Sequence, residues 1–254
     1  MSYGGFQQAT DYIDGTFSTT YPTPLTFVAW INCQAADWLN ATQSNCVNMS
    51  DDSDSDNLIG MTRLGPSGGD RVGCHSEVAG TSTANVAFTD TTYDDIWIPI
   101  IATWDDDTDR DIYIEDSSIT GTNSQTRTLG NILDYVTIGV SSSKINRWRG
   151  LIAEVAIFNK VLSGAEIDAL RTGAQTGPAP NTVASGDCIG YWSLDTDQST
   201  HADESGNSGP TLTVTDGGSI AFDADHPTIT TASVTPLEMA NYQGMNRLNG
   251  GFRS

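Results

Sequence analysis

The sequence predicts an all-β protein, a two-sheet antiparallel sandwich with one short helix, and three observations carry this prediction. Short apolar stretches recur along most of the chain, and turn residues separate them at spacings typical of sandwiches. In residues 135–140 and 151–158, every second residue is apolar, so that one face of an extended chain would be apolar, as in strands with one buried face. After residue 162 this period of two ends and the signals of a helix start appear.

The helix signal is a capping box. Ser163 is followed three residues later by Glu166, a spacing at which the hydroxyl and the carboxylate can each bind a free backbone N–H of the first turn. Arg171 falls in the expected last turn, where the helix macrodipole favours a cation. Gly173 is the expected stop.

Further strands are expected along the first half of the chain. Their ranges are 11–13, 25–31, 57–63, 72–77, 85–88, 96–103 and 110–114. Trp30 should lie in the core. The polar, Asp-rich stretch 37–56 is expected as a long loop at the rim. Pro99 indicates an edge or a bulge in its strand, because proline cannot donate a hydrogen bond to the ladder.

Residues 134–170 resemble the closing segment of the laminin-G-like, concanavalin A-like jelly-roll domains. That family typically shows an Ile-Gly strand end, a Trp or Phe before Gly-Leu-Ile, an acidic strand ending in an aromatic residue, and a Leu-Ser-x-x-Glu-Ile helix. The matching positions here are Ile138-Gly139, 148–152, 154–158 and 162–167. The resemblance implies a jelly-roll sandwich, and it points to a phage or other viral structural protein as one source of such a domain.

The resemblance continues beyond a connector at 172–187, but the order of the elements changes. Residues 188–194 and 203–214 resemble the stretch that usually opens such a domain. Two alternatives are open, a circular permutation or a second domain cut short, and we favour permutation because roughly forty residues of strand cannot bury a core alone. The expected organisation is one sandwich over 1–229 and an extended arm over 230–254.

Charge and composition exclude several classes of partner. The 254 residues include 32 acidic and 11 basic side chains, for a net charge of −21. Nucleic acid is therefore not an expected partner, because phosphate binding needs the opposite sign. A hydrated acidic surface suited to a saline medium is favoured over clustered cation sites as the reason for this charge. No apolar run approaches the roughly 20 residues of a membrane span, and the amino terminus has no secretory leader pattern.

The sequence contains no recognisable catalytic set, so we expect no enzyme. Residues 65–69 fit the pattern G-x-S-x-G, but the following Gly-Asp-Arg-Val-Gly cannot form the helix that a nucleophile elbow needs. Asp111 and Glu115 would lie about 13 Å apart on one strand face, beyond the separation of about 9.5 Å that an inverting glycosidase tolerates. His75, His201 and His226 are expected as isolated surface or capping residues.

The four cysteines match neither a zinc site nor a dense disulfide framework, because they lie far apart without a Cys-x-x-Cys motif. Their positions are Cys33, Cys46, Cys74 and Cys188. Buried free thiols are expected. The alternative is a disulfide between Cys33 and Cys46 that closes a loop.

Two aspartate-rich stretches are candidate Ca²⁺ sites, and calcium is the one cofactor that the sequence suggests. Oxygen ligands at alternate positions suit a hard cation, although the glycine and distant glutamate of an EF-hand are missing. The competing interpretation is a solvated run of charge. The candidate ligands are Asp52, Asp54, Asp56, Asp105, Asp107 and Asp109.

Two function classes remain. The favoured one is a non-enzymatic structural or adhesive protein at the surface of a virus particle, a capsid decoration or tail protein that displays the jelly roll. The alternative is a glycan-binding module of a cell-surface or secreted protein, in which Trp38 or Tyr93 would be exposed in a rim groove. Both interpretations rest partly on analogy of fold, which is a weak guide to function.

The carboxyl-terminal arm favours the first class. Its apolar residues are spaced through Gly and Asn, too sparsely to form a core of their own, and methionine adapts to irregular neighbouring surfaces. We therefore expect them to contact other structural proteins of an assembly, or further copies of this chain in a homo-oligomer. These residues are Tyr242, Met245, Leu248 and Phe252. The alternative is that the arm folds back over its own sandwich.

Overall fold

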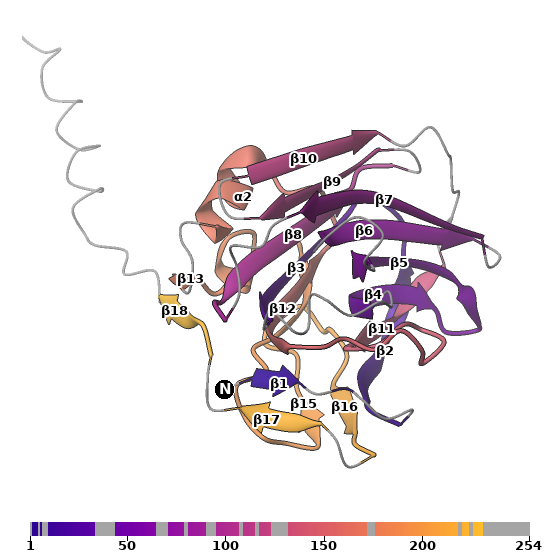
Figure 1. The fold of residues 1–254 in the computed structure, drawn as a ribbon, viewed down its shortest axis with the longest axis vertical. Coiled ribbons are helices and arrows are strands. Elements are labelled where there is room, and N and C mark those ends of the chain that lie inside the picture. The colour runs from indigo at the N-terminus through magenta and orange to yellow at the C-terminus, as the bar shows by residue number, and fades with distance from the viewer. Residues whose placement is uncertain are drawn as a thin grey trace, which may run out of the picture.

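The protein is a sandwich of two antiparallel sheets, shown in Figure 1 as a computed structural model. The structure describes residues 2–4, 6, 10–33, 44–64, 71–78, 81–89, 95–106, 109–114, 117–122, 132–171, 176–217, 220–223 and 226–230. The predicted fold class, all-β with two antiparallel sheets and a short helix, is confirmed. No helix among these residues is long and apolar enough to cross a membrane.

The first sheet has the carboxyl-terminal strand β14 (Cys188–Trp192) beside β12 (Leu151–Phe158). Its strand order is β10 (Ser117–Thr122), β9 (Asp109–Ile114), β8 (Ile98–Trp104), β3 (Leu25–Asn32), β12, β1 (Ser2–Gly4) and β17 (Ala221–Asp223). β12 is therefore the strand at which the amino-terminal, middle and carboxyl-terminal parts of the chain meet.

The second sheet also combines distant segments of the chain. Its order is β15 (Thr200–His201), β16 (Leu212–Thr215), β2 (Tyr12–Tyr21), β11 (Leu133–Ile138), β4 (Ser44–Asp51), β5 (Asp54–Leu64), β6 (Arg71–Val78) and β7 (Thr81–Thr89). A separate parallel pair joins β13 (Thr176–Pro178) to β18 (Thr228–Thr230).

The main core lies between the two sheets. Alternate residues of β11, such as Val136 and Ile138, meet Val155 and Ile157 of β12 there. Trp192 and Leu212 from the carboxyl-terminal strands join the same cluster. Burial of apolar surface at roughly 25 cal/mol per Å² makes this shared core the main stabilising contribution.

The carboxyl-terminal strands belong to the same sandwich as residues 10–13. β14 pairs with β12, β16 pairs with β2, and β17 pairs with β1, all antiparallel. The pairing of β14 with β12 is what a permuted domain requires, and permutation stays our interpretation of it. The expected connector contains β13 and a 3-10 helix, η1 (Pro180–Thr182). The predicted arm, after residue 230, lies outside the described residues.

The predicted capping box is present at the start of helix α2 (Gly164–Leu170), which covers the outer face of the first sheet with Ile167 and Leu170. Ser163 accepts a hydrogen bond from the Glu166 N–H, and the Glu166 carboxylate accepts one from the Ser163 N–H at 2.7 Å. Arg171 is the C-cap instead of a residue of the last turn.

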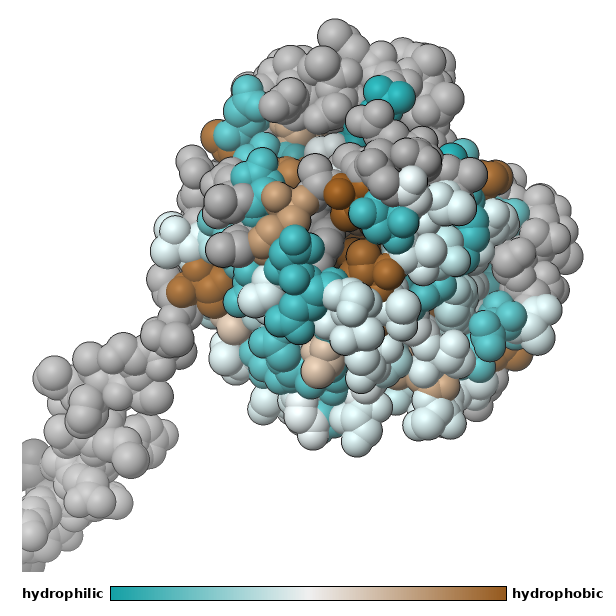
Figure 2. All heavy atoms as spheres, turned by 90° about the horizontal axis from the view of Figure 1, so that it is seen from below, coloured by the Kyte–Doolittle hydropathy of each residue, from teal (hydrophilic) through white to brown (hydrophobic). Residues whose placement is uncertain are grey.

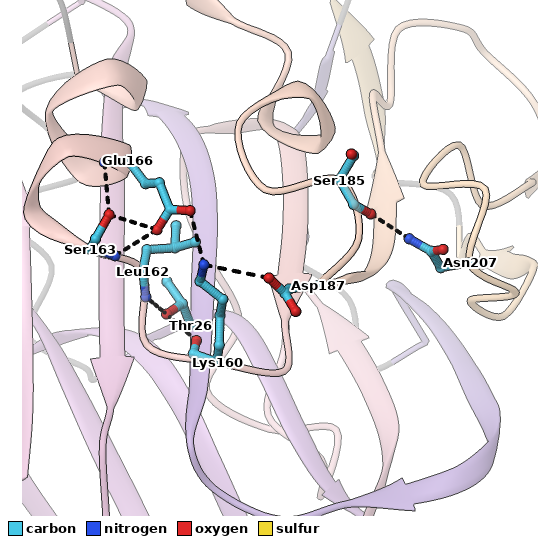
Figure 3. A network of polar contacts seen from close by, with 8 residues as sticks. All are labelled: Thr26, Lys160, Leu162, Ser163, Glu166, Ser185, Asp187 and Asn207. Atoms are coloured by element: carbon cyan, nitrogen blue, oxygen red, sulfur yellow. Dashed lines mark hydrogen bonds and ion pairs between the residues drawn. The ribbon is translucent and has the colours of Figure 1, made fainter.

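A polar network fixes this helix start to the sheet (Figure 3). Lys160 Nζ lies 2.9 Å from Glu166 Oε1 and 3.4 Å from Asp187 Oδ2. The Thr26 hydroxyl of β3 donates to the Lys160 carbonyl at 2.7 Å and accepts from the Leu162 N–H at 3.1 Å. The segment that leads into β14 is thereby bound to the first turn of α2.

The prediction of a rim loop at 37–56 is partly wrong, because residues 44–51 form β4, an internal strand between β11 and β5. Val47 and Met49 of β4 enter the main core. Asn48 is also fully buried, and its amide donates to the Val140 carbonyl at 2.7 Å. Partners supplied by other strands make this polar segment a strand, which its own composition does not indicate.

The expectation for Pro99 also needs correction, because β8 is an internal strand between β9 and β3. Pro99 pairs with Trp30 of β3, while the pairing with β9 begins one residue later, at Ile100. Proline is tolerated there because it stands before the start of the β9 ladder.

Candidate functional site

Three neighbouring cavities lie around the loop that follows β14, residues 193–199. Their volumes are about 370, 290 and 320 Å³, and we name them the inner, middle and outer pockets. The inner pocket is lined by Glu154, Tyr191, Ser193, Asp195, Glu204, His226, Pro227 and Ile229. It shares Ser193, Asp195 and Glu204 with the middle pocket, which in turn shares Gln198 with the outer one. We call these three adjoining cavities the row of pockets.

Figure 2 shows the molecule from below, the side on which β15, β16 and β17 lie in Figure 1. Hydrophilic residues and residues of intermediate hydropathy make up most of the described surface there, and hydrophobic residues occur as scattered spots. The outer pocket combines both kinds, with Asp197 and Asp216 beside Val214, Ile220 and Phe222.

The floor of the inner pocket is built by a bulge in β12. The pairing of β12 with β3 shifts between Ala153 and Ala156, and Glu154 within this bulge has a φ of 52°. A bulge inserts an extra residue and redirects its side chain, so Glu154 breaks the simple alternation expected for 151–158. Its N–H donates to the Ser193 carbonyl at 3.1 Å, which binds the bulge to the loop after β14.

The Glu154 carboxylate is bound from two directions. The Tyr191 hydroxyl donates to Oε2 at 2.5 Å, and His226 Nε2 lies 3.2 Å from Oε1. Burial raises the pKa of Glu154, and the hydrogen bonds from His226 and Tyr191 oppose that rise without cancelling it. Burial and the charge of Glu154 raise the pKa of Tyr191, so its hydroxyl remains a donor.

His226 connects the pocket floor to the chain just before β18. Besides Glu154, its ring nitrogens face the Pro227 carbonyl at 2.8 Å and the Ser193 carbonyl at 3.3 Å. Burial alone would lower the pKa of His226, but the hydrogen bond and charge of Glu154, together with the hydrogen bonds to the Pro227 and Ser193 carbonyls, outweigh burial, so the pKa is raised. The expectation of an isolated histidine is therefore wrong for this residue.

The rim of the inner pocket is formed by exposed carboxylates. Asp195 and Glu204 are both exposed. Glu204 Oε1 accepts hydrogen bonds from the Ser193 N–H at 3.1 Å and from its hydroxyl at 2.6 Å. Asp203 fixes the turn beside Glu204, because its carboxylate accepts from the Tyr191 N–H and the Gly209 N–H, each at 2.9 Å.

The row of pockets offers hydrogen-bond acceptors and negative charge. Its described lining holds five carboxylates, two histidines, His201 and His226, and no lysine or arginine. Carboxylates accept hydrogen bonds from hydroxyl and ammonium groups. Across the described residues, no group of three or more His, Cys, Asp or Glu could hold a metal ion. The arrangement suits a polyhydroxylated or amine-bearing ligand.

Comparison with known families identifies the domain. A laminin G family model, described as the concanavalin A-like lectin/glucanases superfamily, matches residues 7–168, more than half of the chain. The chain belongs to this family. It is a lectin-type, laminin-G-like domain, and the resemblance seen in its sequence is confirmed. Among curated proteins, no match is found.

Solved structures share the fold of this laminin-G-like domain. A heptameric SAP-like pentraxin from Limulus polyphemus has a TM-score of 0.51 at 14% identity, over 84% of this chain and 94% of that one. The enzymatically active domain of tailspike protein 2 from bacteriophage CBA120 has a TM-score of 0.50 at 13% identity, over 73% of this chain and 29% of that one. At such identities the likeness is one of fold.

Several predicted site residues of this laminin-G-like domain fall outside the described residues. They are Trp38, Tyr93, Asp107, Tyr242, Met245, Leu248 and Phe252. Their roles in ligand binding, metal binding and assembly stay predictions.

The remaining candidate metal ligands lie at two hairpins. Asp52 is exposed in the turn between β4 and β5, and its N–H donates to Asp134 Oδ1 at 2.9 Å. Asp54 and Asp56 belong to β5. Asp105 is exposed, and Asp109 begins β9, where its N–H donates to an Asp106 carboxylate oxygen at 2.8 Å. Calcium binding there stays a prediction, which calorimetric titration with Ca²⁺ would check.

The burial of the cysteines and of two histidines tests two further expectations. All four cysteines are buried thiols that form no disulfide bond, as the favoured interpretation predicted. His75 is buried instead of lying on the surface, with its Nδ1 3.2 Å from the Gly60 carbonyl, and burial lowers its pKa to about 4. His201 is also buried, and burial lowers its pKa.

The residues of the inner pocket were not predicted from the sequence. Glu154, Tyr191, Glu204 and His226 are far apart along the chain, and none belongs to a motif of catalysis or binding. The available signal was an acidic residue within the apolar stretch 151–158. That signal alone does not distinguish a site residue from a solvated one.

Proposed function

We propose that this lectin-type domain is a non-enzymatic adhesive module that binds glycans in the row of acidic pockets. One observation carries the proposal. The exposed carboxylates of Asp195 and Glu204 line the same pocket as a floor in which Tyr191 and His226 are each bound to the Glu154 carboxylate. Such a preformed set of acceptors beside a cavity is the arrangement that orients a small polar ligand.

The charge of the pockets defines the class of glycan. Glu154, Asp195 and Glu204 line the inner pocket, while Asp197 and Asp216 line the outer one. Like charges repel a sialylated or sulfated sugar, whereas an ammonium group gains a charge-assisted hydrogen bond. The expected ligands are neutral and amine-bearing oligosaccharides.

The state of Glu154 supports binding without hydrolysis. A glycosidase needs one carboxyl group free to protonate the leaving oxygen and a second carboxylate beside it. The Glu154 side chain is only 2% exposed and already accepts from Tyr191 and His226. A ligand in the inner pocket would therefore meet Glu204 and Asp195 instead of Glu154.

The setting that we propose is the surface of a virus particle, where the module would contact a host glycan and other structural proteins. A cell-surface or secreted protein is the alternative setting. The arm at 230–254 motivates the first setting, and the likeness to a phage tailspike agrees with it at the level of fold. Immunogold labelling of purified particles would detect the chain on a virion, and its absence from particles would favour the alternative.

A binding assay with three sugar classes tests the glycan proposal. Glucosamine, N-acetylglucosamine and sialylated oligosaccharides would be titrated against the protein by calorimetry. Glu204→Gln keeps the acceptor for Ser193 but removes the charge, so glucosamine binding should weaken by about tenfold, the range of one charged hydrogen bond. Asp168→Asn is the matched control, since this exposed helix carboxylate lies outside the pockets.

Two outcomes would overturn the proposal. The first is the failure of all three sugar classes to bind. The second is equal weakening by Glu204→Gln and Asp168→Asn, because a general loss of negative charge would then explain the effect. Tighter binding of the sialylated sugar would contradict the proposed ligand class.

A further inference from the structure

The last described stretch of the chain, residues 226–230, forms one wall of the inner pocket, and we call it the strap. His226, Pro227 and Ile229 of the strap line that pocket. The strap reaches it from β18, which pairs in parallel with β13 over three residue pairs. A Cβ added at Gly177 of β13 would come within 2.7 Å of Trp30 Cζ2, so this small sheet lies directly on the first sheet.

Among the described residues, the strap has few polar contacts with the sandwich, although its Pro227 is buried. Across the described residues, its side-chain hydrogen bonds and ion pairs to other parts of the chain are those of His226, to Glu154 and to the Ser193 carbonyl. The other attachment is the short pairing with β13. A segment with so few polar contacts opens at a lower free-energy cost than the core strands do, so the His226 contacts have a large share in keeping it docked.

The surroundings of His226 select its charged form. Its Nδ1 faces the Pro227 carbonyl at 2.8 Å, and its Nε2 faces Glu154 Oε1 at 3.2 Å and the Ser193 carbonyl at 3.3 Å. All of these atoms are acceptors. Neutral imidazole has one N–H, so one ring nitrogen would direct a lone pair at an oxygen.

The other groups around His226 do not compensate for the loss of its proton. Tyr191 of β14 directs its hydroxyl to Glu154, while Asp195 and Glu204 of the neighbouring loops are carboxylates in the same pocket. The Trp97 ring, which precedes β8, lies 6.3 Å from the imidazole and has no charge. Neutral His226 would therefore offer one N–H to three facing acceptors, Glu154 Oε1 and the Pro227 and Ser193 carbonyls, although Tyr191 still donates to Glu154 Oε2 and the Glu154 N–H to the Ser193 carbonyl.

We propose that the strap is a proton-dependent wall of the ligand pocket, docked while His226 is an imidazolium and released when it loses its proton. Release removes Pro227 and Ile229 from the lining, so ligand binding in the inner pocket weakens as pH rises. Release of the strap is independent of the proposed function. Only the weaker ligand binding rests on it.

The raised pKa of His226 sets both the direction in which docking of the strap changes with pH and the pH range of that change. A histidine in the unfolded or undocked chain has a pKa of about 6.5. Docking is therefore fully favoured below about pH 6.5 and is lost as pH rises through the higher value of the docked residue. At low pH the ion pair between His226 and Glu154 is lost when Glu154 takes up a proton. Burial raises the pKa of Glu154.

Hydrogen exchange on the full chain tests the strap without any ligand. Protection factors, which correct for the intrinsic effect of pH, would be measured for the amides of β18 between about pH 6 and pH 8. We expect the wild type to lose protection by up to about tenfold per unit of pH between about pH 6.5 and the raised pKa of docked His226, and to change little above it. His226→Gln should be unprotected throughout, whereas His75→Gln, at a buried histidine of β6 outside the three pockets, should behave like the wild type.

Glu154→Gln provides a second variant that keeps an acceptor for Tyr191. Loss of the carboxylate charge should move the protection change to lower pH, together with the titration of the His226 ring followed by NMR. A protection factor independent of pH in the wild type would overturn the proposal. So would an unshifted midpoint in Glu154→Gln.

The ligand part needs a probe whose own charge is constant, and an N-acetylglucosamine oligosaccharide meets that condition. Its affinity for the wild type should fall with pH in parallel with strap protection, and should be low at all pH values in His226→Gln. Affinity that stays constant while protection falls would show that the strap is not a wall of the pocket. Failure of the sugar to bind at any pH, with the protection change intact, would reject the glycan proposal and leave the strap proposal standing.

Discussion

The Tyr191 hydroxyl lies 2.5 Å from Oε2 of Glu154, so the carboxyl-terminal strand β14 is hydrogen-bonded to the bulge in β12 through their side chains as well as their backbones. These residues are 37 positions apart in the chain. The bulge directs Glu154 outward, and β14 supplies the donor that makes a buried carboxylate tolerable. The floor of the inner pocket therefore exists only when β14 has joined the first sheet.

The first prediction concerns this bond. Tyr191→Phe removes one of the two donors to Glu154 and should lower the free energy of unfolding by about 1–3 kcal/mol, the cost of an unsatisfied buried polar group. Urea denaturation would measure the change. Tyr113→Phe is the matched control, because that partly buried hydroxyl donates to Asp111 at 3.2 Å, and it should cost about 1 kcal/mol or less. Equal costs would contradict the role given to Tyr191.

The second prediction concerns the helix cap drawn in Figure 3. Ser163→Ala removes the acceptor of the Glu166 N–H and should lower the free energy of unfolding by about 1 kcal/mol. Ser163→Gly should cost only a few tenths of a kcal/mol, because glycine is itself acceptable as an N-cap. Thermal unfolding of both variants would compare them, and an alanine variant as stable as the wild type would contradict the prediction.

The third prediction concerns the buried His75, whose pKa is lowered to about 4 by burial. An unfolded histidine has a pKa of about 6.5, so the unfolded chain binds a proton over this interval that the folded chain does not. The free energy of unfolding should fall by roughly 3 kcal/mol as pH falls from about 6.5 to about 4. Chemical denaturation of wild type and His75→Gln would isolate this contribution, and identical pH profiles would reject it.

The fourth prediction concerns the carboxyl-terminal strands. Deletion of residues 186–229 should yield insoluble protein, because it uncovers the edges of β12 and β2 and removes Trp192 and Leu212 from the core. The soluble fraction after expression would measure this effect. A soluble, cooperatively unfolding deletion variant would show that the remaining strands form a complete sandwich.

The fifth prediction concerns the arm. Truncation before Pro236 should leave the melting temperature unchanged, since the core clusters of the described residues end at Phe222. If the arm attaches the domain to an assembly, the truncated protein should stay folded but be lost from purified particles. Incorporation at full occupancy would instead favour an arm that only covers its own sandwich.

The local elements of the fold could be predicted from the sequence alone. The alternation in residues 135–140 and the capping box at Ser163 and Glu166 are signals between neighbours in the chain, and the structure has both elements. The family resemblance was also readable, because it depends on short motifs at fixed spacings. Local periodicity and capping are properties of a few consecutive residues, so no long-range contact is needed to recognise them.

Tertiary structure alone decided β4, the bulge and the pocket. β4 is a strand because β11 and β5 pair with it and Val140 accepts from Asn48, although its own residues are largely polar. Glu154 became a buried site residue because Tyr191 of β14 and His226, just before β18, reach it from segments far along the chain. Pairing partners, bulges and the burial of polar groups depend on which segments meet in space, and the free energy of those contacts is not encoded in the periodicity of any one segment.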